Sequence, residues 1–204
     1  QQGYNISRSV RLRSSASAYF NRTFGTPTNN KIFTWGGWLK IGTIPSSREG
    51  IFIATNAFGT VYFGLEFNSS AGLTIYDSNA AGALITSQVF RDPSSWYHIV
   101  LAVDTTQATA ANRVKLYVNG YQVTSFSTTN YAAQNSSPYM NSAVSHSIGS
   151  WQPAAGLHFD GYMTEVNFID GQALTPSSFG ENDATTGVWK PKKYGGTYGT
   201  NGFY

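Results

Sequence analysis

Carboxylate pairs are the first chemistry to look for, because two carboxyl groups held together can cleave glycosidic bonds. A retaining pair needs a separation of about 5–5.5 Å, which one strand supplies when acidic residues alternate, as in Glu-x-Asp-x-Glu. No segment of the chain has that spacing. Glu66 and Glu165 could meet across a sheet, but we expect each to face solvent or to pair with Lys or Arg. The glutamates are far apart in the sequence, at Glu49, Glu66, Glu165 and Glu181.

The other residue types that carry out catalysis are scattered. His98, His146 and His158 have no Asp or Glu at a metal-ligand spacing, and no Gly-x-Ser-x-Gly sequence is present. We expect His98 to be a packing residue. The chain has no cysteine, which excludes thiol nucleophiles and Cys-based zinc sites. Residues 196–202 are glycine-rich but lack a following helix and a Lys-Ser/Thr pair. The sequence therefore predicts that the protein is not an enzyme.

Three aspartates near expected strand ends, Asp104, Asp160 and Asp170, are weak candidates for calcium ligands. Calcium takes 6–8 oxygen ligands, and these residues are not grouped at a recognisable spacing. Asp side chains also hydrogen-bond nearby backbone groups in turns. We therefore expect them to cap turns, and calcium is the only cofactor left open.

Aromatic side chains in loops are better functional candidates, because sugar rings stack on exposed Trp and Tyr while polar neighbours bind the hydroxyl groups. A small site of aromatic rings among Asn and Gln is typical of a ligand pocket. Two alternatives are that Trp151 fills one end of the fold and that Tyr131 and Tyr139 pack locally or contact another subunit. The candidate glycan-binding residues are Trp151, Gln152, Tyr131, Asn135, Tyr139 and Asn141.

Short strands must position these residues. The strongest signal is the pair 96–104 and 113–118, which closes on Asn119-Gly120, because a type I′ turn needs positive φ at both central positions. Residues 121–126 can return as the partner strand, and the long polar connection 127–141 is expected to lack regular structure. About eleven short strands separated by turn residues are typical of an all-β, two-sheet antiparallel sandwich. Further strands are expected near 9–13, 18–20, 31–40, 51–54, 61–67, 72–76, 84–90, 147–151 and 157–169, with one short helical turn near 175–180.

Composition and charge limit the classes of partner. The chain has 204 residues, of which 15% are aromatic and 11% charged, and its net charge is +3. That charge is too small for the dense basic face of a nucleic-acid-binding protein. No apolar run approaches the ~20 residues that span a bilayer, so we expect no membrane insertion. The chain begins with Gln1 and has no signal-peptide pattern, which indicates a processed chain or a piece of a longer protein.

Three segments resemble the laminin-G-like, concanavalin-A-like jelly-roll domains. They are the hairpin 96–120, the closing sequence 161–175 and the strand F-T-W-x-x-W-L-K at 33–40. The resemblance covers most of residues 5–181 and implies a jelly-roll domain over 1–181 that binds glycans or proteins. Many relatives bind calcium at a rim of the sandwich. In this chain Thr164 precedes Glu165 where the closing signature usually has Asp, which puts such a site in doubt.

The sequences of residues 100–120, 165–174 and 187–204 also resemble such domains in bacteriophage tail and virion proteins. This implies an extracellular virion protein, in a tail fibre or as a surface decoration, that binds host-surface glycans without catalysis. The extended segment 182–204 is expected to lie along the sandwich or to lead into a neighbouring subunit of a homo-oligomer or larger assembly. Its candidate contact residues are Trp189, Lys190, Lys192, Lys193, Tyr194 and Tyr198.

Two other functions are weighed against glycan binding. The domain could be purely structural, a cement or assembly element whose partners are other virion proteins. It could also be a glycan hydrolase or lyase whose catalytic groups come together only in the folded chain. The sequence does not identify the glycan or the oligomeric state.

Overall fold

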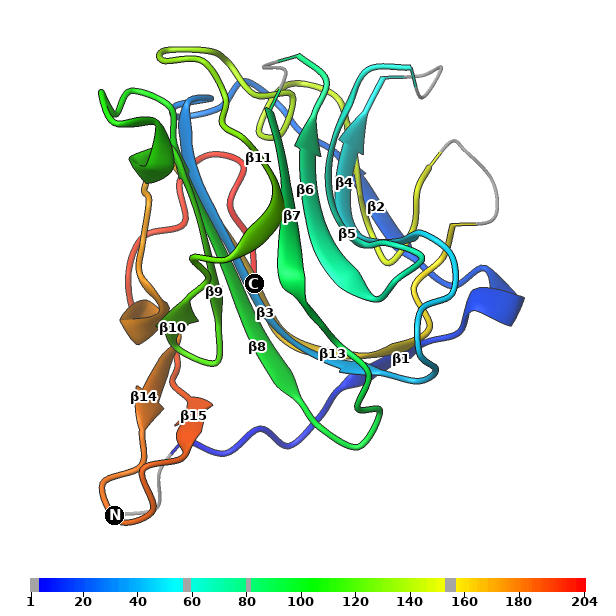
Figure 1. Ribbon diagram of the computed structural model, residues 1–204. Coiled ribbons are helices and arrows are strands. Elements are labelled where there is room, and N and C mark those ends of the chain that lie inside the picture. Colours follow the sequence, from blue (N-terminus) through cyan, green and yellow to red (C-terminus); the bar gives the residue numbers. More distant parts are fainter. Residues whose placement is uncertain (1–3, 57–59, 80–81, 153–156) are drawn as a thin grey trace.

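A computed structural model describes residues 4–56, 60–79, 82–152 and 157–204. Two antiparallel sheets lie face to face (Figure 1). Within the described residues, helical structure is limited to three short 3₁₀ turns, none of which could cross a membrane. The all-β two-sheet sandwich is therefore confirmed. The helical turn expected near 175–180 is the third of these, with Thr175 as its cap and Pro176 in its first turn. The turns are η1 (Ser14–Ala16), η2 (Ala110–Asn112) and η3 (Pro176–Ser178).

The first sheet has six strands in the order β1-β13-β3-β8-β9-β10, and the second has seven in the order β11-β7-β6-β5-β4-β12-β2. The six strands are β1 (Val10–Leu12), β13 (Gly161–Asp170), β3 (Ile32–Ile41), β8 (Tyr97–Asp104), β9 (Val114–Val118) and β10 (Tyr121–Gln122). The seven are β11 (Phe126–Asn130), β7 (Gly82–Val89), β6 (Gly72–Asp77), β5 (Tyr62–Phe67), β4 (Glu49–Thr55), β12 (Ser145–Ile148) and β2 (Phe20–Thr23). A separate hairpin pairs β14 (Gly180–Asn182) with β15 (Trp189–Pro191).

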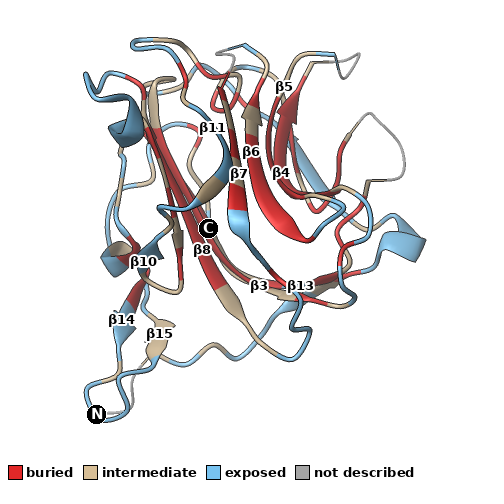
Figure 2. Cartoon of the chain, viewed as in Figure 1, coloured by how far each residue is buried: buried red, intermediate tan, exposed pale blue. Residues whose placement is uncertain are grey.

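The core lies between the two sheets because alternate side chains of the central strands face inward. In β3, Phe33, Trp35 and Leu39 are fully buried, as the alternation predicts. In β5 the inward residues are Phe63 and Leu65. Figure 2 shows that burial is concentrated on the central strands and that exposed segments lie at the edges and turns. Each of these side chains contributes about 1.5–3 kcal/mol by leaving water.

The hairpin between β9 and β10 confirms the predicted turn. Asn119 has φ 49° and Gly120 has φ 88°, the two positive values that a type I′ turn requires. The return strand is shorter than expected, since it comprises Tyr121 and Gln122, followed by one more bond from the N–H of Val123 to the carbonyl of Leu116. The chain then crosses to the other sheet, where β11 pairs with β7. Residues 127–130, expected to lie in a loop, therefore form an edge strand whose side chains are exposed.

The segment after residue 181 lies along the sandwich, the first of the two expected arrangements. The N–H of Lys192 bonds the carbonyl of Phe179, and the N–H of Asp170 bonds the carbonyl of Tyr198. Phe203 then forms a bridge with Phe168 of β13, with two N–H···O bonds of 3.0 Å. These bonds place the C-terminal segment against the six-stranded sheet (Figure 1).

Candidate functional site

The outer face of the seven-stranded sheet carries a group of polar and aromatic side chains. Along β5 the residues 63, 65 and 67 face the core, so Tyr62, Gly64 and Glu66 face outward. Residues 149–152, which follow β12, bring Trp151 onto Gly64. A Cβ at Gly64 would lie 3.4 Å from Cζ2 of Trp151. The indole of Trp151 therefore lies directly over Gly64, at the distance of an ordinary van der Waals contact with a Cβ there.

Glu66 is the charged centre of this group and is only 2% exposed. Its carboxylate accepts hydrogen bonds from Nε and Nη2 of Arg48, at 2.9 and 3.1 Å, and another from the indole N–H of Trp151. Burial raises the pKa of Glu66, and the Arg48 guanidinium opposes that rise. A two-pronged Arg–carboxylate contact fixes the geometry of both side chains. The expected pairing of Glu66 with a basic residue is thus confirmed.

Arg48 and three aromatic rings surround Glu66. Cζ of Arg48 lies 4.6 Å from the centroid of the Trp151 ring, and Tyr62 meets Trp151 edge-on with centroids 4.1 Å apart. Tyr76, on the neighbouring strand β6, has its ring centroid 4.8 Å from that of Tyr62. Both tyrosines are half-buried, so each keeps part of its surface in solvent. We call Arg48, Tyr62, Glu66, Tyr76 and Trp151 the outer-face cluster.

The outer-face cluster combines flat apolar surface with polar groups, which is the composition of many ligand sites. Gln152 adjoins it, is partly exposed, and donates from Nε2 to the hydroxyl of Ser150 at 3.2 Å. Glu66 is the one carboxylate of the cluster. Glu165 lies on β13 of the other sheet, so the two glutamates do not meet across a shared sheet. The cluster can bind and orient a ligand, but it has no carboxylate pair of the kind that cleaves glycosides.

Trp151 was expected either to stack on a ligand or to fill one end of the fold, and the structure shows neither, because the ring is buried on the outer face of the seven-stranded sheet. It is 3% exposed, and its ring is covered by Arg48 and Tyr62. Sequence reasoning missed Arg48, Tyr62 and Tyr76. The alternation of β5 and β6 identifies the two tyrosines as outward-facing, whereas Arg48 precedes β4 and carries no periodic signal.

The four candidates of the long loop lie apart from Trp151. Tyr131 and Tyr139 are partly buried and pack against the main core, which is the local packing expected as an alternative. Asn135 is exposed, and its N–H bonds the carbonyl of Thr105 at 2.8 Å. Asn141 is fully buried, and its Nδ2 donates to Asp170 at 2.7 Å, so it is not placed to contact a glycan. No hydrogen bond or ring contact among the described residues links these four to the outer-face cluster.

The three calcium candidates are occupied by protein donors. Asp104 caps a turn, as expected, by accepting from the N–H and hydroxyl of Thr106 at 3.1 and 2.6 Å. Asp160 instead pairs with Arg11 at 3.2 Å, and Asp170 holds residues from distant segments. No three His, Asp or Glu side chains in the described part of the chain are grouped closely enough to hold a metal ion.

The histidines are packing residues, and for His98 this confirms the expectation. His98 is 1% exposed and stacks on Trp38, with centroids 4.9 Å apart. Its Nδ1 accepts a hydrogen bond of 2.9 Å from the indole N–H of Trp189. Burial lowers the pKa of His98 to about 4, so the ring is neutral at pH 7. His146 is likewise buried, stacks on Phe24 at 3.7 Å and has its pKa lowered to about 4 by burial.

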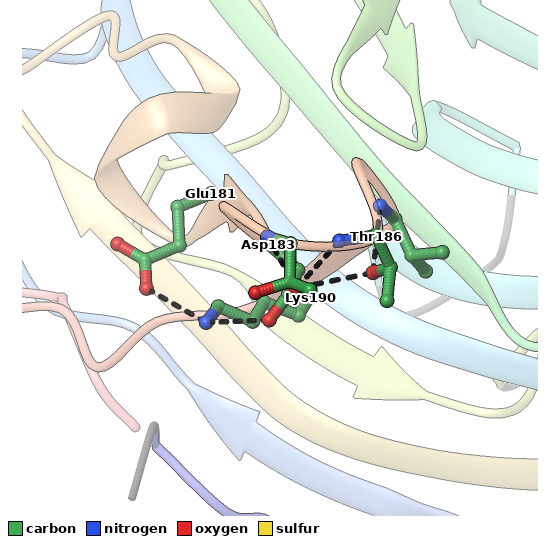
Figure 3. Close-up of polar contacts among 6 residues, drawn as sticks. Glu181, Asp183, Thr186 and Lys190 are labelled. Atoms are coloured by element: carbon green, nitrogen blue, oxygen red, sulfur yellow. Dashed lines mark hydrogen bonds and ion pairs between the residues drawn. The ribbon is translucent and has the colours of Figure 1, made fainter. Parts of the chain in front are cut away.

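The candidate contact residues of the C-terminal segment are largely used within the chain. Trp189 bonds His98, while Tyr194 and Tyr198 pack beside Phe179 on the outer face of the six-stranded sheet. Figure 3 shows Lys190 held in the β14–β15 hairpin, with Nζ 3.2 Å from Asp183 and 3.6 Å from Glu181. The candidates that stay exposed are Lys192 and Lys193.

A sequence model of the family described as the concanavalin A-like lectin/glucanases superfamily matches residues 14–178. No curated protein matches the chain. Among solved structures, the K499G mutant of NanB sialidase from Streptococcus pneumoniae has a TM-score of 0.59 at 12% identity, covering 87% of this chain and 29% of that one. A candidate carbohydrate binding protein from Bacteroides ovatus has a TM-score of 0.54 at 15% identity, covering 90% and 50%.

Trypanosoma rangeli sialidase in complex with sialic acid has a TM-score of 0.50 at 20% identity, covering 72% of this chain and 22% of that one. At these identities the likeness shows the fold alone. The chain spans about a fifth to a half of the length of these three proteins. None of the three is a bacteriophage protein, so the virion origin inferred from the sequence resemblance stays a prediction.

Proposed function

The chain belongs to the concanavalin A-like lectin/glucanases superfamily, and on that premise we propose that it is a non-catalytic domain that binds glycans. The observation that carries this proposal is the outer-face cluster. Tyr62 and Tyr76 present half-buried rings next to the Arg48 guanidinium. Aromatic faces match the C–H side of a pyranose, and the guanidinium and the Gln152 amide can bond its hydroxyl groups.

The state of Glu66 supports binding without catalysis. Both of its oxygens accept hydrogen bonds from Arg48 or Trp151. A general acid or nucleophile needs an oxygen free to reach the substrate. In this arrangement Glu66 holds Arg48 and Trp151 in place, so its role is to position the binding surface.

The finer proposal is that the domain works outside the cell on a bacteriophage virion, in a tail fibre or as a surface decoration. Its support is the resemblance carried by the sequences of residues 100–120, 165–174 and 187–204. A shallow face of rings gives weak single contacts, and many copies on one particle raise the avidity by linking binding events. Host-surface glycans, and other virion proteins that hold the copies together, are then the partners.

Glycan-array binding by the purified chain tests the proposal. Tyr76→Ala removes one half-buried ring of the cluster and is expected to weaken binding about fivefold to tenfold, since stacking contributes about 1 kcal/mol. Tyr121→Ala is the matched control, because this ring is 75% exposed and lies on β10 of the other sheet.

The outcomes separate the three functions. Loss of binding in Tyr76→Ala with retention in Tyr121→Ala supports the proposal. A wild-type chain that binds no glycan contradicts it and favours the purely structural role. Release of new reducing ends from bacterial polysaccharide would show an enzyme instead.

A further inference from the structure

The six-stranded sheet also has a hollow on its outer face, of about 350 Å³. Its lining includes three tryptophans: Trp38 from β3, Trp96 just before β8, and Trp189 from β15. The N-terminal residues 6–9 form another wall, and Figure 1 shows this segment running past the same sheet on its way to β1. Ligand pockets typically have volumes of about 300–1,000 Å³. We call this hollow the tryptophan pocket.

Trp38 has a polar atom that the fold leaves without a partner. Its side chain is 8% exposed, and its indole N–H makes no hydrogen bond within the described residues. Trp189 differs, because its indole N–H bonds Nδ1 of His98. A buried donor without an acceptor costs about 1–3 kcal/mol. The N–H of Trp38 has almost no solvent-exposed surface, like that of Trp35 in the core, so a ligand in the tryptophan pocket does not reach it.

The charges around the tryptophan pocket have one sign. Arg8 and Lys190 contribute to its lining, and no Asp or Glu does. Arg8 is exposed and forms no ion pair among the described residues. Lys190 is already held by Asp183 and Glu181. Arg8 is therefore the cation left available to an anionic ligand.

Aromatic rings and a free cation fit one class of ligand. We propose that the tryptophan pocket binds an acidic saccharide. The pyranose face packs on Trp96 and Trp189, and the carboxylate pairs with Arg8. The guanidinium suits this role because its planar donors match a carboxylate. This site is separate from the outer-face cluster and does not depend on it, since the two lie on different sheets.

Isothermal titration with trigalacturonic acid and its methyl ester tests the proposal, because the two share their rings and differ in charge. The wild type is expected to bind the acid about tenfold more tightly than the ester, and added salt should reduce that ratio. Arg8→Gln should abolish the preference, and Trp96→Ala should weaken binding of both probes. Arg13→Gln, an exposed arginine outside the pocket lining, should change neither.

Two further measurements make the result decisive. Tyr121→Ala, whose ring lies outside both sites, should leave trigalacturonic acid binding unchanged, and Arg8→Gln should leave the Tyr76-dependent binding on the glycan array unchanged, so failure of one site is distinguishable from failure of the other. Circular dichroism of each variant shows whether it folds. Absence of binding by the folded wild type, or an acid preference that survives Arg8→Gln, overturns the proposal. Preferential binding of an eight-residue oligothymidylate, lost in Trp96→Ala, would assign the pocket to nucleic acid instead.

Discussion

Buried ionisable side chains make the stability of this fold depend on pH in opposing directions. Glu49, at the start of β4, is 7% exposed, and burial raises its pKa to about 7. The nearby carboxylate of Asp160 adds to that rise, and the N–H of Asp160 bonds Glu49 at 3.3 Å and opposes it. His98 and His146 have their pKa values lowered to about 4 by burial. Burial in the folded chain therefore favours the neutral form of each of these three side chains.

Glu49→Gln is expected to stabilise the protein above neutral pH. The folded pKa of Glu49 lies above its ordinary value of 4.5, so its favourable contribution is complete below pH 4.5 and is lost as the pH rises through 7. Glutamine keeps an acceptor for the Asp160 N–H and carries no charge. The free energy of unfolding should therefore rise by on the order of 2 kcal/mol at pH 8, allowing for partial solvent screening, and change little at pH 4.5. Urea denaturation at the two pH values measures this.

Glu181→Gln is the matched control, because Glu181 is exposed on the β14–β15 hairpin. His98 and His146 titrate alike in the wild type and in both variants. The stability that they contribute is lost as the pH falls from 6.5 towards 4. Equal differences between Glu49→Gln and the wild type at pH 4.5 and pH 8 would show that Glu49 does not titrate in this range.

At the scale of elements, two hairpins are docked through one side chain. Trp189 of β15 lies between Gly120, in the turn after β9, and Gly180 of β14. A Cβ at Gly120 would lie 2.7 Å from Cε3 of Trp189, and one at Gly180 would lie 2.5 Å from Cζ2. The indole N–H then reaches His98. Glycine at both positions is what allows the β14–β15 hairpin to lie against the six-stranded sheet.

Gly120→Ala is expected to undock this hairpin. The residue has φ 88°, so an alanine there adds backbone strain of about 1–2 kcal/mol as well as the clash with Trp189. Gly187→Ala is a matched control, because Gly187 has φ 70° and open space around its Cβ position. Tryptophan fluorescence and thermal unfolding should both change in Gly120→Ala, whereas Gly187→Ala should show the backbone cost alone. Identical behaviour of the two variants would mean that Trp189 does not depend on Gly120.

The elements also show what a sequence can predict. Strands β3, β5 and β8 were predictable because large apolar residues occupy their inward positions. Edge strand β2 is exposed throughout and β11 is exposed after Phe126, so their sequences carry no alternation, and neighbouring strands determine their pairing. In the candidate site, too, contacts with distant residues decide positions that the local sequence does not predict. Trp151 could be singled out by type, but Arg48 is placed by its ion pair with Glu66, a contact that no spacing reveals.

At the scale of the whole molecule, Asp170 joins segments that are far apart in the chain. Its carboxylate is 2% exposed and accepts the N–H groups of Thr28, Asn29 and Asn201 at 2.7, 3.2 and 3.1 Å. Nδ2 of Asn141 donates to it at 2.7 Å. Burial alone would raise the pKa of Asp170, but these four donors hold it below the usual range. The C-terminal segment is thus tied to the N-terminal loop and to the loop before β12 by one side chain.

Asp170→Asn is expected to loosen the C-terminal segment. Asparagine keeps the shape of the side chain, but an NH₂ group replaces one of the two accepting oxygens. At least one buried N–H that bonded the carboxylate then faces another N–H. The free energy of unfolding should fall by about 3 kcal/mol. Trypsin should cut faster after Lys192 and Lys193, which are exposed and follow β15. Urea denaturation and timed proteolysis followed by mass spectrometry measure the two effects.

Asp183→Asn separates this long-range role from local capping. Asp183 also accepts several hydrogen bonds, from the N–H groups of Thr185 and Thr186 and from Nζ of Lys190, but all lie within the β14–β15 hairpin (Figure 3). Its replacement should therefore leave global unfolding almost unchanged. If both variants lose equal stability, the number of bonds to the carboxylate matters and the segments it joins do not. A large loss confined to Asp170→Asn would show that tying distant segments together is what stabilises the sandwich.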